Sequence, residues 1–294
     1  MRRFSDNPES FFKIWRKSLP VTLASSISSV VPTRILDRSE VAHDVILLGV
    51  EAPELVKKVR PGHFAMALLP GGKAAGVALG IYEAHGSRCS LLFFLAGDRT
   101  RRLGALRVGE RLDIVAPLGN GFDCDGAQRD IAIVAGGVGI ASVLLPAQRL
   151  LARGARVRLF YGARTAERLV EAERFAAEGC ELLLATDDGS RGYHGLVTDL
   201  LAREDAPAAI LACGPTPMLR AVSAYAQQRK IPAQLSLEEA FGCGVGGCWG
   251  CVVPIVRTSM QAPSFPPSEA DGSDVVHARV CVEGPVFWAH ELRW

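Results

Sequence analysis

Four cysteines in the C-terminal part of the chain have the spacing of iron ligands. Cys243, Cys248 and Cys251 follow the pattern C-x4-C-x2-C, and Cys281 is the only cysteine downstream of them. This spacing is that of plant-type [2Fe–2S] clusters, which need four thiolates. Glycines fill most of the gaps between the first three, so the main chain can wrap closely and point N–H groups at sulfur. The sequence therefore predicts a [2Fe–2S] cluster on these four cysteines.

Structural zinc is the alternative for the same residues. Zinc sites commonly use two pairs of closely spaced Cys or His ligands, and here only Cys248 and Cys251 form such a pair. The spacing therefore favours the cluster. Cys89, Cys124 and Cys180 show no ligand spacing, and we interpret them as small buried residues.

Two turns upstream predict a dinucleotide site. The apolar stretch Ile131–Ala135 ends in Gly136-Gly-Val-Gly139 and leads into a helical sequence at residues 141–153. Such a turn can place main-chain N–H groups at a pyrophosphate, although tight turns also need glycine for steric reasons. A second strand end, Ala212-Cys-Gly-Pro-Thr-Pro-Met218, also opens onto a helix. Both turns fall at the carboxyl edge of one predicted sheet, where nicotinamide dinucleotides bind.

A flavin is expected between these two sites for a chemical reason. Nicotinamide delivers a hydride, which carries two electrons at once, whereas a [2Fe–2S] cluster accepts one electron. A flavin does both. We therefore expect the N-terminal part of the chain to bind a flavin.

Three units are expected to position these groups, so the fold class is multi-domain. Residues 33–125 contain short strands broken by Pro and Gly, typical of an antiparallel β-barrel. Residues 126–232 alternate strand and helix, which predicts an α/β parallel-sheet nicotinamide domain. Residues 233–294 form the small cluster module, within which Ser259–Ser273 is expected to be an exposed loop. Residues 1–32 are an N-terminal extension, interpreted as an appended helix or a loosely held tail.

The composition excludes several classes of function. Of the 294 residues, 49% are hydrophobic and 22% charged, and the net charge is only +2. This balance gives no general attraction to nucleic acid or to an anionic membrane, and no apolar stretch reaches transmembrane length. Eight cysteines in a chain of this size suit ligands and free thiols in a reducing, cytoplasmic compartment. No arrangement of catalytic acid and base residues stands out, so we assign no catalytic residue.

Several short motifs share the form found in one protein family. They are Arg60-Pro-Gly-His-Phe64, Pro117-Leu-Gly-Asn-Gly-Phe122, Gly136-Gly-Val-Gly139, Tyr161-Gly-Ala-Arg164, Thr186-Asp-Asp-Gly-Ser190, Gly195-Leu-Val-Thr-Asp199, Cys213-Gly-Pro-Thr-Pro-Met218, Leu237-Glu-Glu239 and Cys281-Val-Glu-Gly-Pro-Val-Phe287. With the order of the units, they resemble the electron-transfer subunit of two-subunit dihydroorotate dehydrogenases, in the ferredoxin–NADP reductase superfamily. The resemblance covers residues 33–294.

The resemblance implies one FAD, one [2Fe–2S] cluster, an NAD(H) site and a hetero-oligomer. The implied partner is an FMN-containing catalytic subunit that oxidises dihydroorotate to orotate in pyrimidine biosynthesis. Electrons would pass between NAD(H), FAD and the cluster, to or from that partner. The nicotinamide-side positions carried over are Gly137, Gly139, Cys213, Gly214 and Met218.

The flavin motif departs from the family. The family has Arg-Pro-x-Ser, with Arg on the FAD pyrophosphate and Ser near the flavin ring. The aligned stretch here is Val77-Ala-Leu-Gly80, which lacks both side chains. Losing a buried charge-assisted pair can cost about 2–5 kcal/mol. Gly80 and Ile81 remain the expected flavin-side positions.

A basic stretch offers compensation for the missing arginine. The family's second phosphate-binding stretch aligns with residues 97–102, where Arg99 and Thr100 are the expected FAD contacts and Arg101 and Arg102 add positive charge. A solvated basic turn is the alternative, because exposure is the usual state of charged residues.

Two further functions stay open at this point. The altered flavin motif allows a paralogue that has lost FAD and keeps the cluster as a structural or relay element. The N-terminal extension and the long segment 252–280 allow a reductase subunit for a different oxidoreductase partner.

Overall fold

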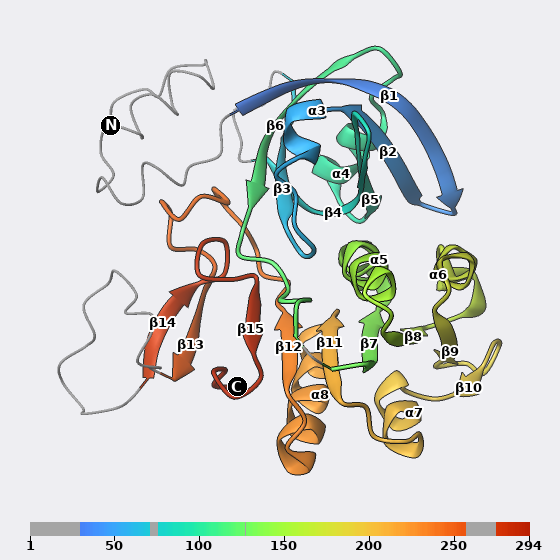
Figure 1. The fold of residues 1–294 in the computed structure, drawn as a ribbon. Coiled ribbons are helices and arrows are strands. Elements are labelled where there is room, and N and C mark those ends of the chain that lie inside the picture. Colours follow the sequence, from blue (N-terminus) through green and yellow to red (C-terminus); the bar gives the residue numbers. More distant parts are fainter. Residues whose placement is uncertain (1–29, 71–75, 127, 257–274) are drawn as a thin grey trace.

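The computed structural model describes residues 30–70, 76–126, 128–256 and 275–294 (Figure 1). The expectations for the N-terminal extension and for the loop 259–273 lie outside the described residues, apart from residues 30–32. No helix in the described ranges is long and apolar enough to cross a membrane.

The first part of the chain forms the predicted antiparallel barrel, drawn from blue to green in Figure 1. Its six strands close in the order β1-β2-β5-β4-β3-β6. They are β1 (Val30–Ala42), β2 (Val45–Glu51), β3 (Phe64–Leu68), β4 (Val77–His85), β5 (Arg88–Phe94) and β6 (Arg111–Leu118), with short helices α3 (Pro53–Val56) and α4 (Asp98–Gly104). Closure leaves no free strand edge, and one apolar core fills the interior.

The second part forms the predicted parallel sheet, which lies below the barrel in Figure 1. The strand order is β10-β9-β8-β7-β11-β12-β15. The parallel strands are β7 (Asp130–Gly136), β8 (Arg156–Ala163), β9 (Glu181–Thr186), β10 (Tyr193–His194), β11 (Ala209–Cys213) and β12 (Ala233–Ser236). Their connections carry the turns η1 (Gly137–Ser142) and η2 (Ala166–Arg168) and the helices α5 (Leu144–Ala152), α6 (Ala172–Glu178), α7 (Val197–Arg203) and α8 (Thr216–Arg229).

The sequence explains the central strands directly. Residues 131–136 of β7 are all buried, which is the continuous apolar pattern of a strand covered on both faces. The helical connection between β8 and β9 is divided into η2 and α6. Glu171 takes a left-handed conformation with φ +60° between them and interrupts the helical path.

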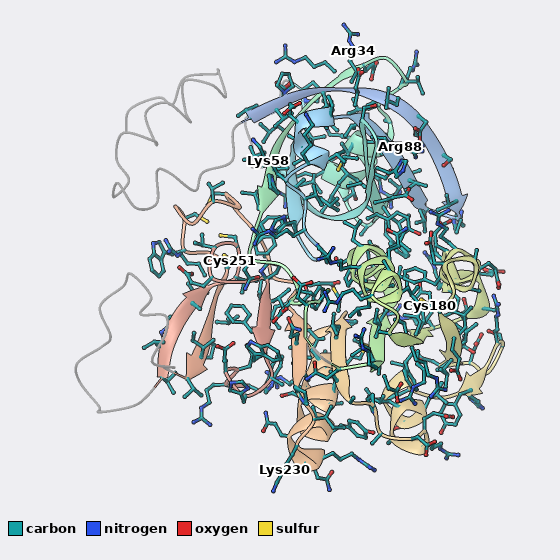
Figure 2. The ribbon with its side chains drawn as sticks, viewed as in Figure 1. Arg34, Lys58, Arg88, Cys180, Lys230 and Cys251 are labelled. Carbon is teal, nitrogen blue, oxygen red and sulfur yellow. The ribbon has the colours of Figure 1, made fainter. Side chains whose placement is uncertain are left out.

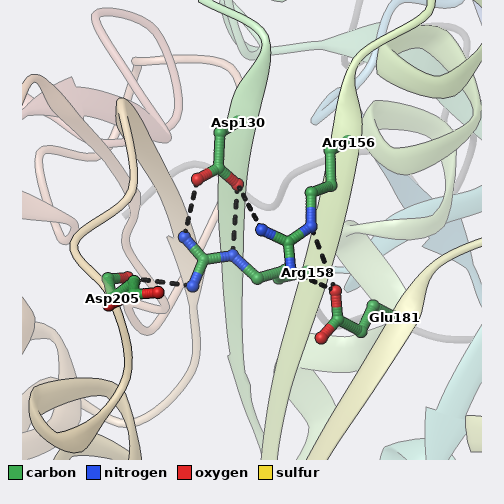
Figure 3. A network of polar contacts seen from close by, with 5 residues as sticks. All are labelled: Asp130, Arg156, Arg158, Glu181 and Asp205. Carbon is green, nitrogen blue, oxygen red and sulfur yellow. Dashed lines mark hydrogen bonds and ion pairs between the residues drawn. The ribbon is translucent and has the colours of Figure 1, made fainter.

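An ion-pair network fixes the edge of the sheet where the strands begin (Figure 3). Arg158 in β8 is only 2% exposed and donates two hydrogen bonds to the carboxylate of Asp130 in β7. It also donates to the main-chain carbonyl of Asp205, while Arg156 bonds Glu181 in β9. A buried guanidinium without its partner costs about 3–5 kcal/mol. The network therefore orders the starts of three strands and leaves the carboxyl edge to ligands.

The C-terminal segment is joined to both other units. Strands β13 (Val252–Val256) and β14 (Val275–Arg279) form a two-stranded antiparallel sheet. The chain then returns as β15 (Val286–Trp288), which pairs antiparallel with β12 and becomes the edge of the large sheet. That sheet thus extends beyond residue 232. The division into units at residues 125 and 232 stays a prediction.

Candidate functional site

Strand pairing brings the distant Cys281 to the other three cysteines. Cys251 directly precedes β13, and Cys281 lies two residues beyond the end of β14. The register pairs Val252 with Arg279, and the N–H of Val280 donates to the carbonyl of Cys251 at 2.9 Å. Figure 2 shows Cys251 between the barrel and this small sheet, while Cys180 lies far away near α6.

The sulfur atoms of this cysteine group receive main-chain hydrogen bonds. The N–H groups of Val245 and Gly247 point at Sγ of Cys243, at 3.5 and 3.3 Å, and the N–H of Gly250 points at Sγ of Cys248 at 3.4 Å. The pKa of Cys243 is lowered to about 4, first by a hydrogen bond from Cys281 and then by the main-chain N–H groups of Val245 and Cys248. Contact with Cys281 also lowers the pKa of Cys251, to about 7. The same contacts raise the pKa of Cys281, so the shared proton stays there, while the main-chain N–H groups favour the thiolate of Cys243, the form that binds iron.

The loop can take this shape only with glycine at two positions. Gly244 and Gly246 have φ of +71° and +82°, and a Cβ at either would collide with Met66 or Val282. In the described part of the chain, no three Cys, His, Asp or Glu side chains are grouped as one metal ion would require. In a [2Fe–2S] cluster each iron needs only two protein thiolates, so no three side chains have to converge on one ion. The donor set and its N–H groups fit such a cluster.

Arg279 contacts the loop that carries Cys243, Cys248 and Cys251, and it was not predicted from the sequence. Arg279 is 5% exposed. Its guanidinium donates to the carbonyl of Gly246 at 3.2 Å and to Glu283, and lies 4.8 Å from the ring centre of Trp249. Trp249 has φ +57°, an unfavourable value for a bulky residue. The arrangement of Arg and Glu two residues on either side of Cys281 was the signal available in the sequence.

The two nicotinamide turns lie side by side, as predicted, because β7 and β11 are neighbours. Their register pairs Ala135 with Cys213. A Cβ at Gly139 would collide with the main-chain carbonyl of Cys213, and one at Gly214 with the main chain of Gly136. Met218 packs at the same point against Gly136. The turn after β7 is the 3-10 turn η1, so the α-helix begins at Leu144 and not at residue 141 as expected.

Two cavities lie between the barrel and the segment that follows β12, and the smaller one also reaches the sheet. One of about 350 Å³ is lined by Gly76–Ala78, Gly97–Thr100 and residues 239–241. The other, of about 210 Å³, is lined by Gly62, Phe64, Ala78–Gly80, Leu92, Val138, Ala141, Ser142, Cys213, Ser236–Glu239, Phe241 and Pro285. Both include Ala78, Glu239 and Phe241. Phe241 stacks on Phe64 at 4.9 Å and precedes Cys243 by two residues, so the second cavity reaches the cluster loop.

The expected flavin residues separate into two groups. Gly80 lines the smaller cavity, and Arg99 and Thr100 line the larger one. Arg99 donates to the carbonyl of Gly76 at 3.3 Å, and Thr100 caps the start of α4 by bonding Gly97. Ile81 is fully buried in the barrel core. The basic stretch forms helix α4, on which Arg101 and Arg102 are exposed and do not belong to the lining of these cavities.

A polar group closes the smaller cavity on the side of the sheet. Cys213 at the end of β11 hydrogen bonds with Ser142 and Ser236, and its Sγ lies 3.7 Å from Oε1 of Glu238. Burial is the main cause that raises the pKa of Cys213, so the thiol stays protonated. Ser142, Ser236 and Glu238 were not assigned from the sequence, because Ser142 is far along the chain from the segment that holds the other two.

Comparison with known proteins agrees with this geometry. The oxidoreductase NAD-binding domain family matches residues 133–224. The chain is 37% identical to the electron transfer subunit of dihydroorotate dehydrogenase B (NAD(+)) from Geobacillus kaustophilus, over 70% of this chain and 74% of that one. It is 32% identical to the subunit of that name from Shouchella clausii, over 88% and 96%.

Solved structures share the fold. A structure of NADH-dependent reduced ferredoxin–NADP oxidoreductase superposes with a TM-score of 0.74 and 26% identity, covering 90% of this chain and 91% of the other. The ferredoxin reductase of carbazole 1,9a-dioxygenase superposes with a TM-score of 0.61 at 21% identity, over 69% and 67%.

A closed barrel followed by an NAD-binding parallel sheet defines an oxidoreductase of the ferredoxin reductase type. Within that class, the chain belongs to the family of electron transfer subunits of dihydroorotate dehydrogenase B (NAD(+)). The resemblance inferred from the motifs is confirmed.

Proposed function

We propose that this chain passes electrons between NAD(H), one FAD and one [2Fe–2S] cluster, to or from an FMN-containing subunit that oxidises dihydroorotate. The observation that carries the proposal is the position of the smaller cavity. Its wall includes Cys213 and Val138 from the two nicotinamide turns, and Phe241 beside the cluster loop. A flavin in this cavity supplies the conversion between two-electron and one-electron transfer.

The residues that would hold each group follow from the geometry. Cys243, Cys248, Cys251 and Cys281 would bind the cluster, and the glycine turn at Gly137 and Gly139 would bind the dinucleotide, with Cys213, Gly214 and Met218 beside it. The phosphates of FAD would lie at the larger cavity, next to Arg99 and the start of α4; Asp98 and Glu239 also line this cavity.

This placement argues against a paralogue without FAD. Arg99 comes from α4 and not from β4, yet it lies beside Val77 at the same cavity. A cation therefore remains near the place where the family arginine would be. The chain would use Arg99 to neutralise the pyrophosphate and Thr100 to fix the helix start that faces it.

The partner would approach the exposed side of the cluster. Cys251 and Cys281 are buried, at 2% and 3%, whereas Gly247, Cys248 and Gly250 are exposed. Electrons would leave or enter on the side of Cys248. We place the assembly in the cytoplasm, because a cluster held by thiolates suits a reducing compartment, and we assign it to pyrimidine biosynthesis from the names of the relatives.

One experiment tests these steps together. The purified chain is examined under anaerobic conditions by visible and EPR spectroscopy, before and after NADH is added. We expect flavin absorbance that bleaches, followed by the EPR signal of a reduced [2Fe–2S] cluster. A protein without flavin, or a cluster that stays oxidised, would overturn the proposal. Co-purification with a dihydroorotate-oxidising FMN subunit tests the partner.

A further inference from the structure

Gly80 stands where the family has a serine, and the side chain of Ser142 lies at that place in the structure. An ideal Cβ built on Gly80 would lie less than 3.0 Å from Oγ of Ser142, closer than real Cβ atoms approach another atom. Gly80 belongs to β4 of the barrel, whereas Ser142 ends η1 of the nucleotide domain. The hydroxyl of Ser142 therefore occupies the volume in which a serine at position 80 would begin.

Ser142 lies at the wall of the smaller cavity. Ser142 and Gly80 both line it, together with Leu79 and Cys213. Ser142 also makes a side-chain hydrogen bond with the Cys213 thiol. A polar atom held at the wall of a largely apolar cavity is the feature that orients a bound ring.

We propose that Ser142 supplies the flavin ring with the hydroxyl contact that position 80 no longer provides, from the nucleotide domain instead of the barrel. The inference rests on the proposed function, since it requires FAD in the smaller cavity. Ser142 acts here as a flavin-binding residue. Ser142 would then compensate for the absence of a serine at position 80.

The test uses the full-length chain with its cluster in place and measures the dissociation constant for FAD by fluorescence quenching. Ser142→Ala is expected to weaken FAD binding about three- to tenfold, the range of one net hydrogen bond. The double variant Gly80→Ser/Ser142→Ala returns a hydroxyl to the barrel side and is expected to bind FAD within about twofold of the parent protein. The φ of Gly80 lies outside the left-handed range, and Cβ of residue 142 would be 3.4 Å from the new Cβ, so the exchange fits sterically.

Ser236→Ala is the matched control, because Ser236 bonds the same thiol and lines the same cavity without contacting position 80. We expect it to change FAD binding less than Ser142→Ala does. Equal losses would assign the effect to Cys213 and overturn the proposal. Unchanged FAD binding and an unchanged flavin spectrum in Ser142→Ala would also overturn it, as would a double variant no better than the single one.

Two further measurements keep the outcomes distinct. The thermal midpoint and the iron content of each variant show whether it folds and keeps its cluster. A parent protein that binds no FAD would contradict the proposed function itself. A parent protein that binds FAD, with variants that bind it equally well, would contradict only the role of Ser142.

Discussion

The side-chain amide of Asn120 makes two hydrogen bonds with the main chain of Val286. Nδ2 donates to the carbonyl at 2.7 Å, and Oδ1 accepts from the N–H at 3.1 Å. Nδ2 also donates to the carbonyl of Glu283, and the N–H of Asn120 donates to that of Gly284. The end of the barrel is thereby joined to the segment that follows Cys281, which explains why both stretches carry distinctive motifs.

Asn120→Ala should loosen this joint. It leaves main-chain groups at Glu283 and Val286 without their partners, so we expect the free energy of unfolding to fall by about 1–2 kcal/mol. Denaturant titration measures the change, and iron release to a chelator should accelerate. Unchanged iron release would show that the joint does not support the cluster segment.

Arg279→Lys should weaken cluster retention while conserving charge. Lysine cannot reproduce the planar contacts with Glu283, Gly246 and Trp249. We expect faster loss of iron and sulfide to a chelator, with the flavin content of the protein unchanged. Arg293→Lys is the matched control, because Arg293 is exposed in the same unit. Equal stability of the two variants would contradict the role given to Arg279.

Arg99→Ala should weaken FAD binding by about tenfold or more, the size of a hydrogen bond to a charged group. The effect should diminish as salt concentration rises, because Arg99 is exposed and its attraction to phosphate is screened. Arg101→Ala, on the same helix but away from the cavity, should bind FAD as the parent does. If Arg101→Ala weakened binding equally, the general positive charge of α4 would be responsible.

Gly139→Ala should disrupt the nicotinamide turn through a steric clash and not through backbone strain. Its φ is not in the left-handed range, but a Cβ would collide with the main-chain carbonyl of Cys213, which cannot rotate away. We expect slower reduction of the flavin by NADH in stopped-flow measurements, with FAD and iron content retained. Reduction at the parental rate would exclude this turn from the nicotinamide site.

Local patterns in the sequence were sufficient for most of the fold. The short strands expected in residues 33–125 are those of the barrel, and the apolar run at residues 131–135 lies in β7. These elements are specified by neighbours in sequence, through turn residues and continuous apolar runs. The break at Glu171 was not predictable in this way, because the residues around it have ordinary helical composition.

The parts of the site that escaped prediction depend on contacts between distant segments. Cys281 was assigned as a ligand by its position after the motif, but its approach to Cys251 depends on the pairing of β13 with β14. Ser142 and Gly80 meet across two units, 62 positions apart in the chain. Local sequence propensities do not predict the contact between Ser142 and Gly80, since it forms only when the barrel packs against the sheet.

The turn η1 is six residues long, from Gly137 to Ser142. One end would touch the dinucleotide and the other the flavin, so the two ligands would share a single short piece of main chain. Sites joined in this way are thermodynamically linked, and the factor by which one ligand alters the affinity of the other is the same in both directions. Bound NAD⁺ would then change how firmly the chain keeps its FAD, and FAD would set the affinity for NAD⁺ by an equal factor.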